Sequence, residues 1–149
     1  MERPDAGFTL VETLMAIVLV GTLAVAAMVT LRSTIVASRL DRDHANAHAW
    51  LQTASDVLYG EERVDCGTQA ATDEAGVRAA YQAIIATTVN PEGWPPGNIT
   101  IVPPVKFWDG VSAYGTVCYD DSGINLQLIK LEVRDPGGDI VESVEIVKG

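Results

Sequence analysis

Residues Phe8–Leu31 read FTLVETLMAIVLVGTLAVAAMVTL, and most of the expected architecture follows from this stretch. It is 24 residues long, contains no proline and carries one charged side chain, that of Glu12. As an α-helix it would span roughly 36 Å, enough to cross the hydrocarbon core of a bilayer. A buried core helix is the alternative, but the run is too long and too apolar on all sides for one. We therefore predict a membrane-spanning helix over residues 8–31.

Two features inside this stretch bear on that prediction. Its four threonines suit a membrane helix because a Thr hydroxyl can bond back to a backbone carbonyl of its own helix. Glu12 is harder to place, since an unpaired acid in the bilayer costs roughly 2.5 kcal/mol or more. It either sits in the headgroup zone or pairs with a positive partner, and the residue itself leaves both interpretations open.

A cleavable secretory signal peptide is a second interpretation of this N-terminus. Ala24-Val25-Ala26 offers the small-x-small pattern of a cleavage site after an apolar stretch. However, the flank Met1–Gly7 holds one base and two acids, whereas such signals begin with a net positive flank. The charge of Glu12 within the apolar region is a further objection.

Charge and length limit what the rest of the chain can do. The 149 residues include 20 acids against 10 Lys and Arg, for a formal net charge of -10. An acidic surface argues against binding nucleic acid and against adhesion to anionic lipid headgroups. One anchoring helix leaves room for one small domain, which we expect over 60–149.

The helical pattern continues past Leu31 and becomes amphipathic. No Pro or Gly interrupts it before Gly60, and apolar residues recur at spacings of three and four: Ala47, Trp50, Leu51, Ala54, Val57 and Leu58. We predict that residues 32–59 form a stalk helix that continues the helix over 8–31 and packs one face against the domain.

The remaining residues predict one further helix and a small sheet. The helix is expected from about Asp73 to Thr87 with Asp73 as N-cap, followed by a loop over Asn90–Gly97. Asp135–Gly138 has the composition of a tight turn. β-type runs occupy Ile99–Val102, Thr116–Asp120, Leu126–Val133 and Ile140–Val147. The fold class is therefore α+β, a lollipop with a long N-terminal transmembrane and stalk helix packed on a small C-terminal antiparallel meander.

The residues around the start of the apolar stretch form a motif, Ala6-Gly7-Phe8-Thr9-Leu10-Val11-Glu12. It resembles the class III signal sequence of type IV pilins and of the pseudopilins of type II secretion systems. In that family a hydrophilic leader ends in Gly, a prepilin peptidase cuts after it, and a Glu stands at the fifth position beyond the cut. The resemblance makes 1–7 the leader, Gly7 its last residue, Phe8 the mature N-terminus and Glu12 the isolated acid.

The resemblance implies a function as well as a processing site. The α-amine of Phe8 would be methylated, and Glu12 would offset that amine on a neighbouring subunit in a filament. Implied partners are other pilin subunits, the prepilin peptidase, a membrane assembly platform and lipid. The implied location is the cytoplasmic membrane with the domain outside, and a surface filament after assembly. The alternative is a single-pass membrane-anchored binding module that does not polymerise.

Three features depart from the family. The leader is net acidic rather than basic, and no Pro occurs between Phe8 and Tyr59, where many members have one. Arg32, Arg39 and Arg42 follow the apolar helix while only Arg3 precedes it, so the positive-inside tendency favours the opposite orientation. This charge bias conflicts with the orientation that the resemblance implies.

Cys66 and Cys118 are the chain's two cysteines. Two separate buried thiols are one interpretation. If the domain is exported, a disulfide is favoured for two reasons. The environment outside the cytoplasm is oxidising, and so small a domain has a thin core that a disulfide would stabilise.

Few residues suit other chemistry. His44 and His48 lie four apart on the stalk helix, but two ligands are too few for a metal site, and we expect solvated side chains. Asp120 and Asp121 suit a turn better than a Ca²⁺ site, which needs six or more oxygens. No catalytic set, cofactor or metal site is predicted, and the chain does not read as an enzyme.

Overall fold

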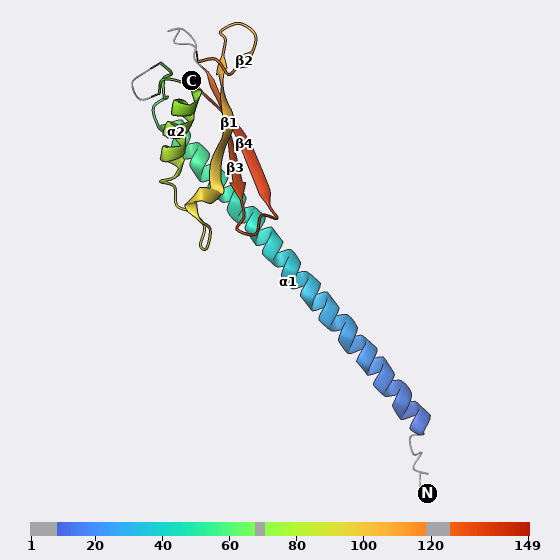
Figure 1. Cartoon of the computed structure of the whole chain (residues 1–149). Helices are drawn as coiled ribbons and strands as arrows, with labels where there is room; N and C mark the ends of the chain where they lie inside the picture. Colours follow the sequence, from blue (N-terminus) through green and yellow to red (C-terminus); the bar gives the residue numbers. More distant parts are fainter. Residues whose placement is uncertain (1–8, 68–70, 119–125) are drawn as a thin grey trace, which may run out of the picture. The chain divides into compact units, whose positions relative to one another are not determined.

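The computed structural model describes residues 9–67, 71–118 and 126–149. Figure 1 shows the helices and strands within these ranges. In chain order they are α1 (Leu10–Gly60), α2 (Glu74–Ile85), the short 3-10 helix η1 (Pro96–Asn98), β1 (Ile99–Trp108), β2 (Tyr114–Gly115), β3 (Gln127–Arg134) and β4 (Val141–Lys148). The long apolar N-terminal helix and the small antiparallel sheet confirm the predicted α+β class.

The chain divides into two compact units, Met1–Asp41 and Arg42–Gly149. The second unit begins within α1, ahead of the expected start at Gly60, because Ala47 and Trp50 are already buried in its core.

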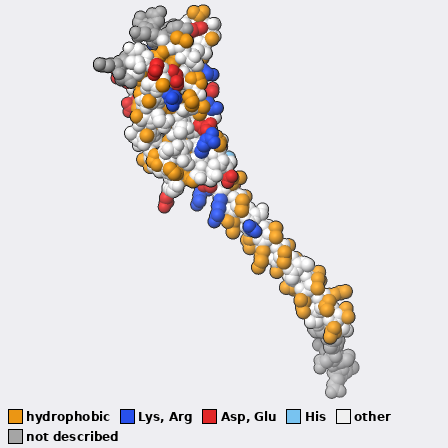
Figure 2. Space-filling view, viewed as in Figure 1, with side chains coloured by type: hydrophobic (Ala, Val, Ile, Leu, Met, Phe, Trp, Pro, Cys, Tyr) orange, Lys and Arg blue, Asp and Glu red, His pale blue; other side chains and the backbone are white. Residues whose placement is uncertain are grey.

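In the first unit, all the side chains of α1 are exposed, and hydrophobic ones run along the face of the helix seen in Figure 2. Among the described residues, α1 is the one helix long and apolar enough to cross a membrane. The expected threonine bonds are present. Thr22 donates its hydroxyl to the carbonyl of Leu19 at 2.9 Å, and Thr30 donates to that of Ala26 at 2.9 Å. These bonds satisfy the hydroxyls inside an apolar helix.

In the second unit, the end of α1 and the whole of α2 pack on one face of the sheet (Figure 1). Both helices contribute to a single hydrophobic core, and alternate residues of β3 point into it, as the period of a strand requires. The largest fully buried side chains include Tyr81, Leu58, Ile85, Ile129 and Leu131.

The order of the strands differs from the predicted meander. The order is β2-β1-β3-β4, with every pair antiparallel, so β3 lies beside β1 rather than beside β2. β1 also runs on to Trp108, past the end expected at Val102. The added part of β1 contains Pro103 and Pro104, which lack the N–H that continues a ladder. The structure resolves the break with a register shift between Val102 and Lys106, after which pairing with β3 resumes.

The strand expected over Thr116–Asp120 is wrong for the residues that the structure describes. Thr116–Cys118 has no strand geometry, and the short β2 ends just before it at Gly115. The segment leaves the sheet at this point because Cys118 is held by Cys66, in the segment that follows α1. Asp120 lies outside the described residues.

Locally encoded features match their predictions. Asp73 caps α2 by accepting a hydrogen bond from the Gly76 N–H at 2.9 Å. The tight turn between β3 and β4 is closed by the Asp135 carboxylate, which accepts from the N–H groups of Gly137 at 2.9 Å and Ile140 at 2.7 Å. Gly138 adopts a φ of 78°, which favours glycine.

Candidate functional site

The start of α1 is built around Thr9 and Glu12. The Thr9 hydroxyl accepts a hydrogen bond from the Glu12 N–H at 3.3 Å, and the Thr9 carbonyl accepts from the same N–H at 3.1 Å. Thr-x-x-Glu is the spacing of a capping box, so Thr9 is the helix N-cap. This role of Thr9 was not predicted, although the Thr-x-x-Glu spacing is present in the sequence.

Glu12 lies in the first turn of α1, and its side chain is exposed. A negative charge there is favourable because the helix dipole places positive partial charge at its N-terminus. Within residues 9–67, 71–118 and 126–149, no ion pair involves Glu12. Gly7 and Phe8, the predicted processing residues, lie outside the described residues.

The two cysteines are brought together in the second unit. Cys66 and Cys118 have Cα atoms 5.8 Å apart, at disulfide distance, and are joined as a disulfide 52 residues apart in the chain. This supports the bonded interpretation over two separate thiols. Cys66 is 5% exposed and belongs to the core.

A buried hydrogen-bond network fixes the segment that follows α1. The Tyr81 hydroxyl donates to Gln127 Oε1 at 2.6 Å and accepts from the Val64 N–H at 2.9 Å. Gln127 Nε2 completes the ring by donating to the Val64 carbonyl at 2.8 Å. Burial raises the pKa of the Tyr81 phenol above its usual value of 10.0. The phenol therefore stays neutral and acts as both donor and acceptor.

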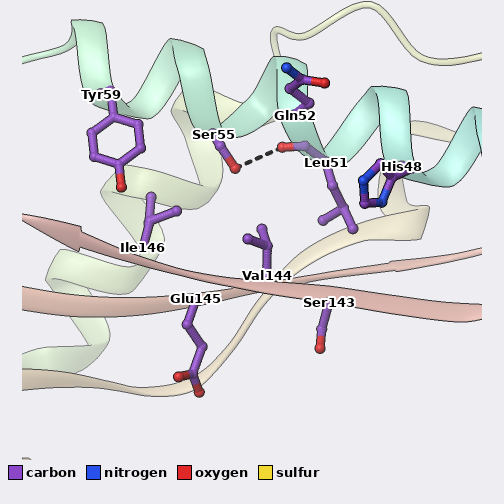
Figure 3. A pocket seen from close by; sticks show the side chains of 9 residues that line it. All are labelled: His48, Leu51, Gln52, Ser55, Tyr59, Ser143, Val144, Glu145 and Ile146. Atoms are coloured by element: carbon purple, nitrogen blue, oxygen red, sulfur yellow. Dashed lines mark hydrogen bonds between the residues drawn. The ribbon is translucent and has the colours of Figure 1, made fainter.

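A groove of about 450 Å³ lies between α1 and β4 (Figure 3). From α1 it is lined by His48, Leu51, Gln52, Ser55 and Tyr59. From β4 it is lined by Ser143, Val144, Glu145 and Ile146. Figure 3 shows the side chains of Val144 and Ile146 pointing toward α1 and that of Glu145 pointing to the other side of the strand. The Ser55 hydroxyl donates to the Leu51 carbonyl at 2.8 Å, so this polar group of the groove already has a hydrogen-bond partner.

The two stalk histidines have separate surroundings. His44 Nδ1 lies 2.9 Å from Glu142 Oε1, which links α1 to β4, while His48 forms part of the groove wall. The contact of His44 was not predicted, because Glu142 is distant in sequence. Among the described residues, no group of three or more metal-ligating side chains gathers. The candidate Ca²⁺ turn at Asp120 and Asp121 lies outside these residues.

An apolar helix of membrane-spanning length that leads into a small α+β unit fits a membrane-anchored protein with one anchoring helix. Residues 3–28 match the family model for the prokaryotic N-terminal methylation motif. This motif is the hallmark of the prepilin-type signal of type IV pilins and pseudopilins, so the predicted signal is confirmed. Comparisons with curated proteins and with solved structures find no match.

The motif supports a pilin-like or pseudopilin-like precursor. It points to a structural subunit rather than an enzyme, and together with the apolar helix it fits an anchor in the inner membrane. In general it suggests other pilin subunits and a prepilin peptidase as partners.

Proposed function

We propose that this chain is a pilin-like structural subunit, a pseudopilin or minor pilin, of a type IV pilus or type II secretion-type filament. The observation that carries the proposal is the methylation motif over residues 3–28, which runs directly into the one described helix that could span a bilayer. Prepilin peptidase cleaves between Gly7 and Phe8. The segment 8–31 then anchors the subunit in the cytoplasmic membrane and later packs in the filament core.

Glu12 is the assembly residue in this proposal. Its carboxylate is exposed in the first turn of α1 and has no ion pair among the described residues. The amine of Phe8 on a neighbouring subunit supplies the missing positive charge. Inside a packed bundle of apolar helices, such a pair strongly favours the one stagger that brings the charges together.

The location follows from the same processing. The N-terminus stays on the cytoplasmic side, and the second unit lies outside the membrane. A disulfide between Cys66 and Cys118 suits that side, because disulfides persist in oxidising compartments. Assembly moves the subunit from the membrane into a surface filament.

Mass spectrometry of the membrane-extracted protein tests the processing step. We expect a mature N-terminus at Phe8 that carries the mass of one added methyl group. Gly7→Leu should retain the leader, because the bulky side chain obstructs the extended backbone that the peptidase must bind. An intact Met1 in the wild-type protein contradicts the proposal and favours a membrane-anchored module that does not polymerise. A cut after Ala26 would indicate ordinary secretion.

The same preparation tests Glu12. Glu12→Ala should be cleaved at the same position but lose most filament assembly, while Thr13→Ala, one residue away, should assemble normally. Electron microscopy and shearing assays measure assembly. Wild-type amounts of filament from Glu12→Ala would refute the role given to its carboxylate.

A further inference from the structure

Two cations of the second unit, Lys106 and Lys130, have no bonded partner among the residues that the structure describes. The other cations of this unit are all engaged. The buried Lys148 ammonium donates to backbone carbonyls, and each arginine lies within 4.0 Å of an acid: Arg42, Arg63, Arg78 and Arg134. The chain has 20 acids against 10 Lys and Arg, so acids to pair with are abundant. The two unpaired lysines are therefore exceptions.

Both lysines lie on the face of the sheet that points away from α1 and α2. Their neighbours Phe107 and Ile129 are buried in the core, and side chains alternate between the two faces of a strand. Lys106 is paired with Leu128 in the ladder, and Lys130 is two residues further along β3. Such diagonal positions are roughly 7–8 Å apart, so two long and flexible lysine side chains can meet on one anion.

A cavity of about 240 Å³ lies at the bulge in β1 and is lined by both lysines. Part of its wall is apolar, formed by Val102, Pro104 and Leu128. Glu74 of α2 holds the bulge from the core side, because its Oε1 accepts a hydrogen bond from the Val105 N–H at 2.8 Å. The volume is below the roughly 300–1,000 Å³ of pockets that enclose drug-sized ligands, so the cavity suits one small group.

Glu145 also lines the cavity and sets its charge. Figure 3 shows this side chain pointing away from α1, toward the face that carries the lysines. Glu145 is opposite Lys130 in the ladder, yet no ion pair joins the two. The lining therefore has two positive charges and one negative charge. A singly charged anion neutralises it, whereas a phosphate dianion would leave excess negative charge beside Glu145.

We propose that this cavity binds a carboxylate on a short aliphatic stem, held by the ammonium groups of Lys106 and Lys130. Val102 and Leu128 pack against the stem, and the apolar wall strengthens the charge-assisted hydrogen bonds by lowering the local dielectric constant. Glu145 repels a second negative charge. An acidic side chain of a polypeptide and a free short-chain acid share this chemistry. The site is independent of the proposed filament function, since its residues lie in β1, β3 and β4.

Lysine labelling of the detergent-solubilised full-length protein tests the site, because the chain has three lysines. N-hydroxysuccinimidyl acetate modifies the amines, and mass spectrometry gives the rate at each one at constant ionic strength. N-acetylglutamate α-amide represents an acidic side chain, and butyrate represents a free short-chain acid. The site predicts that at least one of them slows labelling of Lys106 and Lys130 together, while the buried Lys148 is unaffected.

The probes separate the two sources and the competing chemistries. Stronger protection by the glutamate probe indicates a polypeptide, and stronger protection by butyrate indicates a free acid. N-acetylglutamine α-amide should bind roughly tenfold or more weakly than the glutamate probe, because it loses the charge-assisted hydrogen bonds. Equal protection by the glutamine probe or by inorganic phosphate would overturn the proposal, as would no protection by either acid.

Substitutions separate the site from a general effect of charge. Lys130→Gln should abolish the protection of Lys106, and Lys106→Gln that of Lys130. The matched control Arg134→Gln removes a cation of β3 that is already in an ion pair, and it should retain protection. Glu145→Gln should strengthen binding and admit phosphate, because the repelling charge is gone. Slow labelling of Lys148 in each variant verifies that the fold is intact. Unchanged protection in both lysine variants would refute the site.

Discussion

Asp109 shows how one exposed side chain fixes a loop. Its Oδ1 accepts hydrogen bonds from the N–H groups of Val111 at 2.8 Å, Ser112 at 2.8 Å and Ala113 at 3.1 Å, and it thereby shapes the connection between β1 and β2. These backbone bonds, those from Ala113 and Ser112 above all, lower the pKa of Asp109 from 3.8 to about 2.

Because the pKa is lower in the folded state, the ionised carboxylate stabilises the fold above pH 3.8, and this contribution is lost as the pH falls from 3.8 toward 2. We expect Asp109→Asn to unfold at a lower temperature than wild type at pH 7, with the difference shrinking below about pH 4. Thermal unfolding of the detergent-solubilised protein across this range measures it, with Asp56→Asn on the exposed face of α1 as control. A difference that stays constant with pH would contradict the assigned role.

At the scale of elements, the Tyr81–Gln127 network joins α2, β3 and the segment after α1. Gln127→Leu leaves the Tyr81 O–H without its acceptor and the Val64 carbonyl without its donor, at a cost of about 1–3 kcal/mol for each buried group. Tyr81→Phe/Gln127→Leu should therefore destabilise the protein by less than the sum of the single variants. Urea unfolding of the full chain gives the free energies of unfolding of the wild type, the two single variants and the double variant. Strictly additive losses would show that the network does not act as a unit. As a control, Tyr59→Phe changes a half-exposed ring and should leave the free energy of unfolding nearly unchanged.

Elements defined by neighbouring residues could be predicted from the sequence, and those defined by distant pairs could not. The Asp73 cap and the Asp135 turn depend on atoms within a few residues of each other. The order of the strands depends on which partner β1 finds, and the continuation of β1 past Val102 depends on a register shift in its pairing with β3. The contact of His44 could not be predicted for the same reason, because its partner Glu142 lies 98 residues away in the sequence. The N-terminal methylation motif could be recognised from the sequence because its residues follow one another in the chain.

At the scale of the whole molecule, the disulfide constrains a small domain with a thin core. It closes 52 residues between Cys66 and Cys118, which is worth about 4 kcal/mol in the chain-entropy description. Cys66→Ser/Cys118→Ser should lose stability of that order and become insensitive to reductant. Wild-type protein treated with dithiothreitol should fall to the same value. Chemical unfolding in the presence and absence of reductant measures both, and a wild-type protein that ignores reductant would show that the bond adds nothing to stability.

The bond between Lys148 and the end of α1 has a consequence for the order of events in the cell. The buried Lys148 ammonium donates to the Leu58 carbonyl at 2.6 Å, across 90 residues of sequence, and to the carbonyl of Glu61. It thereby satisfies acceptors that a helix end otherwise leaves to solvent. The ribosome makes α1 first and β4 much later, so the second unit cannot close until the chain through Lys148 has been delivered. In a chain exported as proposed above, the second unit would therefore cross the membrane as an open chain and close on the far side.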